Sequence, residues 1–465
     1  MMASFIRRGL VVATALLLGL ALANGAAAQG MYYKEIKKDG RIYVFNDAKK
    51  AEAFEKSGEV GTGLTRPAAG PNGETVVADS EQALELFFFK YGIAQVVERP
   101  KSPTQKIEWR DGKTRITTDK AYLEVSNRVQ VRYSHEFPAD TVTLPGTAKA
   151  GDSRGSFRIR RAKFKLEGWV YKPELAYEVQ LNWPAVTGSN PGAFLEDANI
   201  SWDVSRKGTF KLMLGQNKVP FGHQELTSSG SQSFVDRSEV SNQYARGRDL
   251  GLTVIGVLGN NRLEYRAGIY NGNGLTRTTN DNDEFQYNAR LMWQLTGGQN
   301  LKQRAWVSGP LYSEGDFETS DKPIVWLAGN FEKNDFHRTT TNNDLKDTIF
   351  GFDGGLKYRG FYATAEYYIR ERTPETGSRF NSDGWFAQAS YLFGKRKWEI
   401  AGRYGTFDPS DLVGSNDRKE WRVGGSYYYN RHSMKVQADY GQLEAGASTG
   451  SVKNKELRVQ TQIIF

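Results

Sequence analysis

The sequence predicts an all-β transmembrane β-barrel of 16 antiparallel strands, with 18 as the open alternative, preceded by a small α+β domain. Three observations predict this fold. The chain ends on an alternating strand, Lys455–Phe465, with an aromatic last residue; a barrel must pair its last strand with its first, whereas the termini of soluble domains usually fray. The first residues have the pattern of an export signal. Between the two, segments of about ten residues alternate apolar and polar side chains, as strands between lipid and water do.

The first 28 residues have the pattern of a secretory signal peptide. Arg7 and Arg8 precede an apolar run, Leu10–Ala23, and the run Ala26–Ala28 offers small residues for cleavage. The apolar run has about fourteen residues, whereas a membrane-spanning helix needs about twenty. We therefore expect export and cleavage after Ala28 rather than an anchor helix.

The composition limits the class of protein. Mean hydropathy is −0.58, and beyond the signal no apolar run is long enough for a membrane helix, so a membrane location requires strands. The chain has 49 Gly, 10 Trp, 23 Tyr and 25 Phe, which suits aromatic girdles around a barrel. It has no cysteine, which excludes disulfides and thiolate metal sites, and no cofactor-binding or nucleic-acid motif. The formal charge is +9, or about +7 without Arg7 and Arg8, so a pore lined by this chain would favour anions. A basic solvated surface is the alternative.

Residues 29–98 predict a small α+β domain. We expect it in the periplasm, bound to a periplasmic or cell-wall partner through an apolar helix face; a plug in the barrel mouth is the alternative. Residues 99–119 are predicted to be a linker, with a hairpin signal at Asp111-Gly112. The predicted elements of the domain are a hairpin of Tyr32–Lys37 and Arg41–Phe45, a helix Ala48–Lys56, a loop Gly61–Gly73, a strand Glu74–Ala78 and a helix Ser80–Tyr91.

Residues 120–465 carry the two-residue period of the barrel. An even number of strands is what bacterial single-chain barrels use. The predicted strands are Tyr122–His135, Phe157–Tyr171, Leu175–Trp183, Leu195–Val204, Thr209–Asn217, Asp249–Leu258, Arg262–Tyr270, Phe285–Leu295, Ile324–Lys333, Thr348–Tyr358, Phe361–Arg370, Trp385–Phe393, Lys397–Phe407, Arg418–Tyr429, Met434–Leu443 and Lys455–Phe465.

The connections between these strands alternate between long and short. Barrels have long outer loops and short periplasmic turns, so this parity supports the strand count. One connection breaks the rule: Thr296–Pro323 should be short but has 28 residues. Either it hides a further hairpin, which would give 18 strands, or it is an enlarged turn. A β-sandwich, the remaining alternative, would have shorter strands.

Alternation also predicts which side chains face the lumen. Tyr287, Leu291 and Trp293 should face lipid, whereas Gln286, Asn288 and Arg290 should face water. In the same way, Glu178, Gln180 and Asn182 should face the lumen. Polar alternates of this kind indicate a wet lumen.

The densest charge lies on the second predicted strand. Arg158, Arg160, Arg161, Lys163 and Lys165 alternate with apolar residues, and the alternation slips at Arg160-Arg161. A β-bulge there would direct two adjacent guanidinium groups into the lumen, where they offer bidentate donors to oxyanions. The alternative is a ring of charge at the rim that only repels cations.

The longest loop, between Lys218 and Arg248, is expected to fold inward and narrow the pore; an external flap is the alternative. Its cations face acids in the same loop, which suggests a constriction with internal ion pairs. Its candidate pore residues are Lys218, Arg237, Arg246 and Arg248, and Arg266 and Arg290 on later strands complete the candidate set.

At these residues the sequence resembles the phosphate-selective porins of the O and P type. The resemblance spans about residues 107–465 and implies a 16-stranded homotrimeric anion channel with an arginine-lined eyelet. It implies that Arg160 and Arg161 belong to the eyelet and that Lys218 and Arg237 lie on the inward loop. The amino-terminal domain, the long Thr296–Pro323 turn and acids such as Glu167, Glu178, Glu264 and Glu366 depart from the family pattern. The matching motifs are RIRRAKFKLEG at Arg158–Gly168, LGQNKVPFG at Leu214–Gly222, LTSS at Leu226–Ser229, FVDRS at Phe234–Ser238, GRDLG at Gly247–Gly251, WRDGK at Trp109–Lys113 and the terminal Phe465.

We therefore expect an outer-membrane porin that passes small hydrophilic solutes, prefers anions such as phosphate, needs no cofactor and forms a homotrimer among outer-membrane lipids. The alternative is an outer-membrane tether or adhesin whose amino-terminal domain binds the cell wall or a periplasmic partner. An enzyme is not expected, because no nucleophile motif accompanies any histidine; the four are His135, His223, His337 and His432.

Overall fold

The computed structural model describes residues 32–61, 63–93, 105–110, 112–139, 152–183, 194–275, 279–296, 311–318, 322–338, 343–447 and 450–465. The predicted signal peptide lies outside these ranges. The chain divides into two compact units, Met1–Ser102 and Pro103–Phe465. Among the described residues, no helix is both long and apolar enough to cross a membrane.

The amino-terminal unit is an α+β domain, as predicted. Its four-stranded sheet has the order β1-β2-β4-β3, in which β2 and β4 run parallel. The strand β3 was missed, because three residues in a Gly/Pro-rich stretch show no periodicity and were predicted as loop. The elements are β1 (Lys34–Lys38), β2 (Arg41–Phe45), α2 (Ala48–Ser57), β3 (Leu64–Arg66), β4 (Thr75–Ala78) and α3 (Glu81–Tyr91).

The two helices of this domain begin at side-chain caps and cover opposite sets of sheet residues. The Asp47 carboxylate accepts the Lys49 N–H at 2.8 Å, and the Ser80 hydroxyl accepts the Ala83 N–H at 3.1 Å. Helix α3 buries its apolar face against β2 and β4, whereas α2 packs on Phe45. The apolar helix face therefore belongs to the domain's own core and does not by itself require an external partner, so the periplasmic or cell-wall partner stays a prediction.

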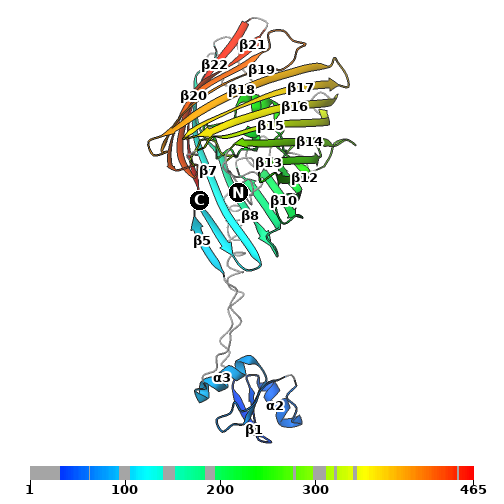
Figure 1. The fold of residues 1–465 in the computed structure, drawn as a ribbon, viewed down its shortest axis with the longest axis vertical. Coiled ribbons are helices and arrows are strands. Elements are labelled where there is room, and N and C mark those ends of the chain that lie inside the picture. The colour runs from blue at the N-terminus through cyan, green and yellow to red at the C-terminus, as the bar shows by residue number, and fades with distance from the viewer. Residues whose placement is uncertain are drawn as a thin grey trace, which may run out of the picture. The chain divides into compact units, whose positions relative to one another are not determined.

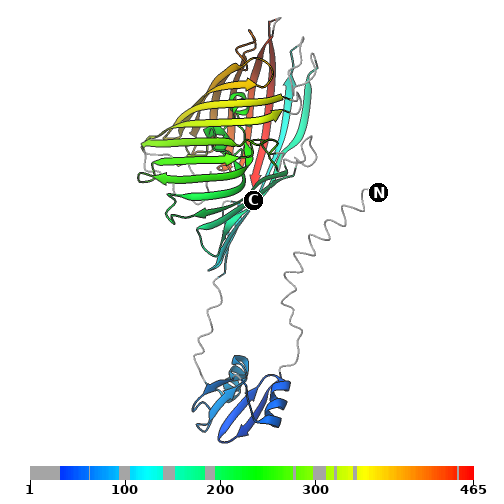
Figure 2. The ribbon, with the colours of Figure 1, turned by 90° about the vertical axis from the view of Figure 1, so that its right-hand side faces the viewer.

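The second unit is a closed antiparallel barrel of 16 strands with two extra strands (Figures 1 and 2). The ring closes where β22 pairs with β7, from Lys455 opposite Phe137 to Ile464 opposite Arg128. The strands of the ring are β7 (Ala121–Phe137), β8 (Arg154–Val170), β9 (Leu175–Asn182), β10 (Leu195–Asp203), β11 (Lys211–Lys218), β12 (Arg248–Leu258), β13 (Leu263–Tyr270), β14 (Gln286–Thr296), β15 (Ile324–Arg338), β16 (Asn343–Tyr358), β17 (Phe361–Pro374), β18 (Phe380–Phe393), β19 (Trp398–Asp408), β20 (Arg418–Asn430), β21 (Met434–Ala447) and β22 (Gly450–Ile464).

The two extra strands form a hairpin, β5 (Lys106–Arg110) and β6 (Lys113–Thr117), within the predicted linker. Strand β6 pairs with the first residues of β7, up to Val125, and β22 pairs with the rest of the same edge. At the hairpin turn, Gly112 has φ 75°, and a Cβ there would lie 2.2 Å from the Ile464 carbonyl oxygen. Only glycine fits where the hairpin meets the end of the chain.

Several strands of the second half are longer than predicted. Strand β15 runs to Arg338, β17 to Pro374 and β21 to Ala447, so parts of the predicted loops are paired strand. His337, predicted in a loop, lies on β15. The added ends of these strands carry few regularly spaced apolar residues. The alternation of apolar and polar side chains, from which strands are predicted, therefore stops before the backbone hydrogen bonding between strands does.

The predicted register of the wall is confirmed on β14. The outward residues Tyr287, Leu291 and Trp293 are exposed, whereas the alternate residues Gln286, Asn288 and Arg290 are buried inside the ring. Because side chains alternate across a strand, each exposed lipid-facing residue identifies its neighbours as inward.

Candidate functional site

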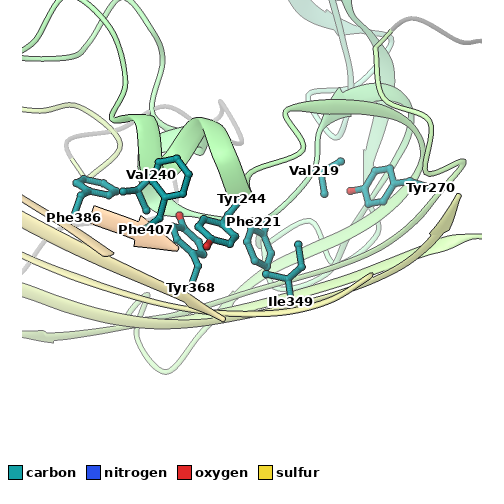
Figure 3. Close-up of a cluster of buried hydrophobic side chains, with 9 residues drawn as sticks. All are labelled: Val219, Phe221, Val240, Tyr244, Tyr270, Ile349, Tyr368, Phe386 and Phe407. Atoms are coloured by element: carbon teal, nitrogen blue, oxygen red, sulfur yellow. The ribbon is translucent and has the colours of Figure 1, made fainter. Parts of the chain in front are cut away.

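The connection between β11 and β12 folds into the barrel, as predicted, and carries the short helices α5 (His223–Leu226) and α6 (Glu239–Tyr244). Figure 3 shows α6 directing Val240 and Tyr244 toward the wall. Tyr244 stacks on Tyr368 with ring centroids 5.2 Å apart. The loop is thus fixed by a hydrophobic cluster, which excludes the external flap. The cluster comprises Val219, Phe221, Val240, Tyr244, Tyr270, Ile349, Tyr368, Phe386 and Phe407.

The connection between β14 and β15 also enters the barrel. Its described part, residues 311–318, buries Leu311 and Tyr312 against Met292, Trp326 and Tyr362. The Tyr312 hydroxyl donates to Glu264 at 2.5 Å, and its ring stacks on His223 at 5.0 Å. In the described part, Thr296–Pro323 is therefore an enlarged turn that packs inside the ring and adds no strand to the wall.

The enlarged turn interlocks with the inward loop. The Glu314 carboxylate accepts the Ser233 N–H at 2.7 Å, and the Glu314 N–H donates to the Ser231 carbonyl at 2.8 Å. His432 Nε2 lies 2.9 Å from the Glu314 carbonyl oxygen. The two inserted segments thus form one packed body along the inner face of the wall.

The same turn crosses the end of the barrel that carries the short connections, here called the short-turn end. The Gly360 N–H, between β16 and β17, donates to Asp316 at 2.9 Å. Phe317 packs edge-on against Tyr428 at 4.8 Å, and Arg431, between β20 and β21, pairs with Glu318 at 2.6 Å. Eight residues therefore span the inner surface from β13 to β21.

A charged cavity of about 390 Å³ remains between the inward loop and the opposite wall, β6 to β13. Ten cationic and four acidic side chains line it. The cationic ones are Lys113, Arg128, Arg160, Arg161, Lys163, Lys165, Lys218, Arg237, Arg248 and Arg266, and the acidic ones are Glu167, Glu178, Glu196 and Asp197.

The predicted β-bulge is present on β8. Gln130 lies opposite Arg161 and Val131 opposite Ile159, so Arg160 is the extra residue. As a result both Arg160 and Arg161 line the cavity. Arg161 donates to the Gln130 side chain at 3.0 Å.

Three predicted lining residues are paired with the acids of the cavity. Lys163 forms an ion pair with Glu196, and Lys165 lies 2.8 Å from Glu167 and 3.1 Å from Glu178. Arg248 holds both oxygens of Asp197 at 2.9 Å. These acids offset much of the positive charge of their partners.

Lys218 and Arg237 fasten the inward loop. Both donate to backbone carbonyls around the end of α5: Lys218 reaches Leu226 at 3.1 Å, and Arg237 reaches Thr227 at 3.0 Å. Arg237 also pairs with Glu225 at 3.0 Å. Their ammonium and guanidinium groups therefore shape the cavity as well as line it.

Three of the predicted residues lie outside the charged cavity. Arg158 is exposed on β8. Arg246 pairs with Glu332 and Asp347 and lines a second cavity, of about 590 Å³, beside Arg370 and Arg372. Arg290 is buried, and its NH2 donates to Asp353 at 2.9 Å.

Arg128 is a lining residue that the sequence reasoning missed. It lies on β7 and donates to the Ser228 hydroxyl of the inward loop at 3.0 Å. Within the described ranges it forms no ion pair with a carboxylate, and its buried Nε has no partner. The signal was present: Arg128 falls on the same polar register as Gln130 and Arg132 in a predicted strand. Lys113, on the hairpin strand β6, is a second lining residue that was not predicted, and it forms an ion pair with Glu124 on β7.

The comparisons with known proteins identify the family. A model of the family described as phosphate-selective porin O and P matches residues 131–465. The chain belongs to this family. It is an outer-membrane porin, as its motifs predicted.

Solved structures agree on the fold. An anion-selective porin from Comamonas acidovorans matches at 11% identity over 74% of this chain and 100% of its own, with a TM-score of 0.52. The outer-membrane channel DcaP of Acinetobacter baumannii matches at 10% identity over 74% of this chain and 98% of its own, with a TM-score of 0.53. At such identities the likeness shows the barrel fold alone. A search of curated proteins returned no match.

Proposed function

We propose that this porin passes small hydrophilic solutes by diffusion through the charged cavity, with a preference for anions such as phosphate. The observation that carries the proposal is the excess of cationic over acidic side chains in the cavity lining, ten against four. In a narrow passage with walls of low dielectric constant, such an excess raises the local concentration of anions and opposes the entry of cations.

Pairing within the lining suggests which cations meet the solute. Lys163, Lys165 and Arg248 are held by acids of the cavity, whereas Arg128, Arg160 and Arg161 lack a close bidentate carboxylate partner. A guanidinium group presents parallel donors that match an oxyanion. We assign the direct anion contacts to these three arginines. Lys163, Lys165, Lys218, Arg237, Arg248 and Arg266 complete the proposed lining, and Arg158, Arg246 and Arg290 would act only through their longer-range field.

Reversal potentials in a salt gradient test the anion preference. The wild-type channel in a planar bilayer should prefer chloride over potassium, and Arg160→Ala with Arg161→Ala should reduce that preference. Arg158→Ala is the matched control, because Arg158 lies on the same strand but outside the cavity. Cation selectivity of the wild type would defeat the proposal.

Phosphate itself requires a separate measurement. Titration of phosphate into chloride-conducting single channels should reduce the current at concentrations at which sulfonate buffers have no effect. If phosphate only carries current like chloride, the preference is for anions in general and the phosphate part of the proposal is lost.

We also propose that the amino-terminal domain is periplasmic. The start of β5 pairs with Thr117, beside the first residue of β7 at the short-turn end, and short turns face the periplasm in bacterial barrels. The chain has no native cysteine, so a single introduced cysteine reports its own exposure. An impermeant maleimide should label Leu412→Cys, in a long connection, on intact cells, but Lys49→Cys only after the outer membrane is opened.

The homotrimer implied by the family resemblance is part of the same proposal, and the mass of the detergent-solubilised complex tests it.

The tether alternative rests on the separately folded amino-terminal domain. Single-channel conductance separates the two functions, since a tether with a blocked barrel passes no current.

A further inference from the structure

Asp236, on the inward loop, meets four guanidinium groups. Its Oδ2 lies 2.6 Å from Arg132 NH1 and 3.6 Å from Arg458 NH1. Its Oδ1 lies 3.5 Å from Arg160 NH2 and 3.7 Å from Arg161 NH2. One carboxylate of the loop thus bridges the bulged strand β8 to β7 and β22.

For three of these arginines, Asp236 is the one acidic partner in the described part of the chain. Arg132 otherwise donates to the Gln460 side chain and the Val235 carbonyl, and Arg161 to the Gln130 side chain. Arg458 differs, because its guanidinium holds both oxygens of Asp439, at 2.8 and 3.0 Å. Three guanidinium charges therefore share a single carboxylate, which leaves an uncompensated positive charge at the edge of the cavity.

The loop holds this carboxylate firmly in place. The Val235 N–H donates to Asp439 at 3.0 Å, and Arg403 donates to the Asp236 carbonyl at 3.0 Å. Asp236 is not among the cavity-lining residues, whereas Arg160 and Arg161 are. The carboxylate is therefore expected to act on a solute mainly through these two arginines.

We propose that Asp236 is a resident counter-anion that sets the affinity of the constriction for passing anions. The inference rests on the proposed function, because it concerns the same arginines. A solute in a selective channel must bind well enough to enter and weakly enough to leave. Asp236 competes for Arg160 and Arg161 and repels an incoming anion, so it keeps anion binding weak and exchange fast.

The charge dependence of the effect identifies its cause. Coulomb energy scales with the product of the charges, so the carboxylate opposes a doubly charged phosphate more than it opposes chloride. Neutralising Asp236 should therefore strengthen phosphate binding more than it changes the preference for chloride over potassium. A residue that merely pins the loop would affect both solutes through pore width.

The test compares Asp236→Asn with wild type in single-channel recordings. We expect the phosphate concentration that halves the current to fall about tenfold, with a smaller shift of the reversal potential toward greater anion preference. Asp236→Glu should restore the wild-type value, because it restores the charge. Glu239→Gln is the matched control: it removes a charge from the same loop, and Glu239 forms no ion pair with the described residues.

Folding of each variant is checked by its heat-modifiable migration in detergent gels. Asp236→Ser is a second neutral variant, and we expect it to lower the half-blocking phosphate concentration as Asp236→Asn does. An unchanged half-blocking concentration in folded Asp236→Asn or Asp236→Ser overturns the inference while the proposed function stands. Wild-type cation selectivity overturns the proposed function instead. A change of conductance without a change in phosphate block indicates a loop anchor and also overturns the inference.

Discussion

The two sides of the barrel carry similar apolar strands on the outside but differ in what lies against them on the inside. From β6 to β13 the inner face carries ionic and amide side chains and borders a cavity. From β16 to β19 it carries buried charged residues as well, but also Ile349, Tyr368, Phe386 and Phe407, which pack on the inward loop. The inner face of each strand in this barrel therefore matches what packs against it, either a charged cavity or the inward loop. Under the proposed function, solutes pass along the first side, and the second side holds the inward loop in place.

The contrast extends to the charged residues. On the cavity side, arginines such as Arg128 and Arg160 keep donors without a carboxylate partner. Outside this cavity, Arg290 on β14 and Arg246 on the inward loop are matched by Asp353, Glu332 and Asp347. Removing one partner of a buried ion pair leaves the other charge uncompensated. We therefore expect Arg290 and Arg246 to stabilise the fold through their carboxylate partners, whereas Arg128 and Arg160 leave donors beside the charged cavity.

Replacing Arg290 should have the largest effect on stability. In Arg290→Gln, the buried Asp353 loses its cationic partner, and breaking such a pair costs about 3–5 kcal/mol. The anion preference should change little, because Arg290 does not line the cavity. Denaturant unfolding followed by gel migration measures the loss, and the double variant with Asp353→Asn should recover part of it. A stable Arg290→Gln channel with reduced anion preference would show that Arg290 serves conduction rather than stability, which contradicts the division between the two sides.

Removing an aromatic anchor should loosen the constriction. Tyr368→Ala deletes the ring that stacks on Phe221 and Tyr244, and such a truncation costs about 3–5 kcal/mol of packing. We expect larger, noisier single-channel currents. Tyr367→Ala is the control, because this neighbour points outward; equal behaviour of the two variants would show that the packed side does not hold the loop.

The outer pattern of the barrel could be predicted because lipid imposes a regular period on it. The 16 ring strands, the bulge at Arg160 and the inward loop follow from alternation, slippage and length. The packed inner side could not be predicted in the same way. In the sequence, Phe386 and Tyr368 resemble any other aromatic residue of a strand. Only the three-dimensional position of the inward loop shows that both side chains pack against it.

For a similar reason, the sequence does not decide whether Thr296–Pro323 contains a further hairpin or is an enlarged turn. Residues 311–318 have no two-residue period, and their burial depends on Glu264, Ser233 and Gly360, which are far away in sequence. Arg128 is different, because its polar register with Gln130 and Arg132 already places it inside the barrel, whereas local charge density is highest from Arg158 to Lys165. For a strand residue, register predicts an inward position better than local charge density does.

Weakening the enlarged turn should have an intermediate effect. Tyr312→Ala loses the stacking on His223 and the bond to Glu264, at a cost of roughly 2–4 kcal/mol to the packing of this segment. We expect a higher conductance with most of the anion preference retained, since Arg266 loses its contact with the Tyr312 ring but keeps its ion pair with Glu264. Glu318→Gln, at an exposed ion pair, is the control. A conductance equal to wild type in folded Tyr312→Ala would mean that the turn does not narrow the passage.

Arg128 gives the smallest and most discriminating test of the cavity side. Arg128→Gln keeps a polar side chain next to Ser228 but removes a charge that no described carboxylate pairs with. One unit charge at about 4 Å in a watery passage contributes about 1 kcal/mol, or roughly a fivefold weaker interaction with phosphate once it is lost. Stability should change little, in contrast to Arg290→Gln, because no buried carboxylate is left unpaired. Phosphate block of single channels measures the affinity, and Arg158→Gln serves as the charge-matched control outside the cavity. If phosphate blocks Arg128→Gln and Arg158→Gln channels at the same concentration, anions do not pass beside β7. The division of the barrel into a conducting side and a supporting side would then be wrong.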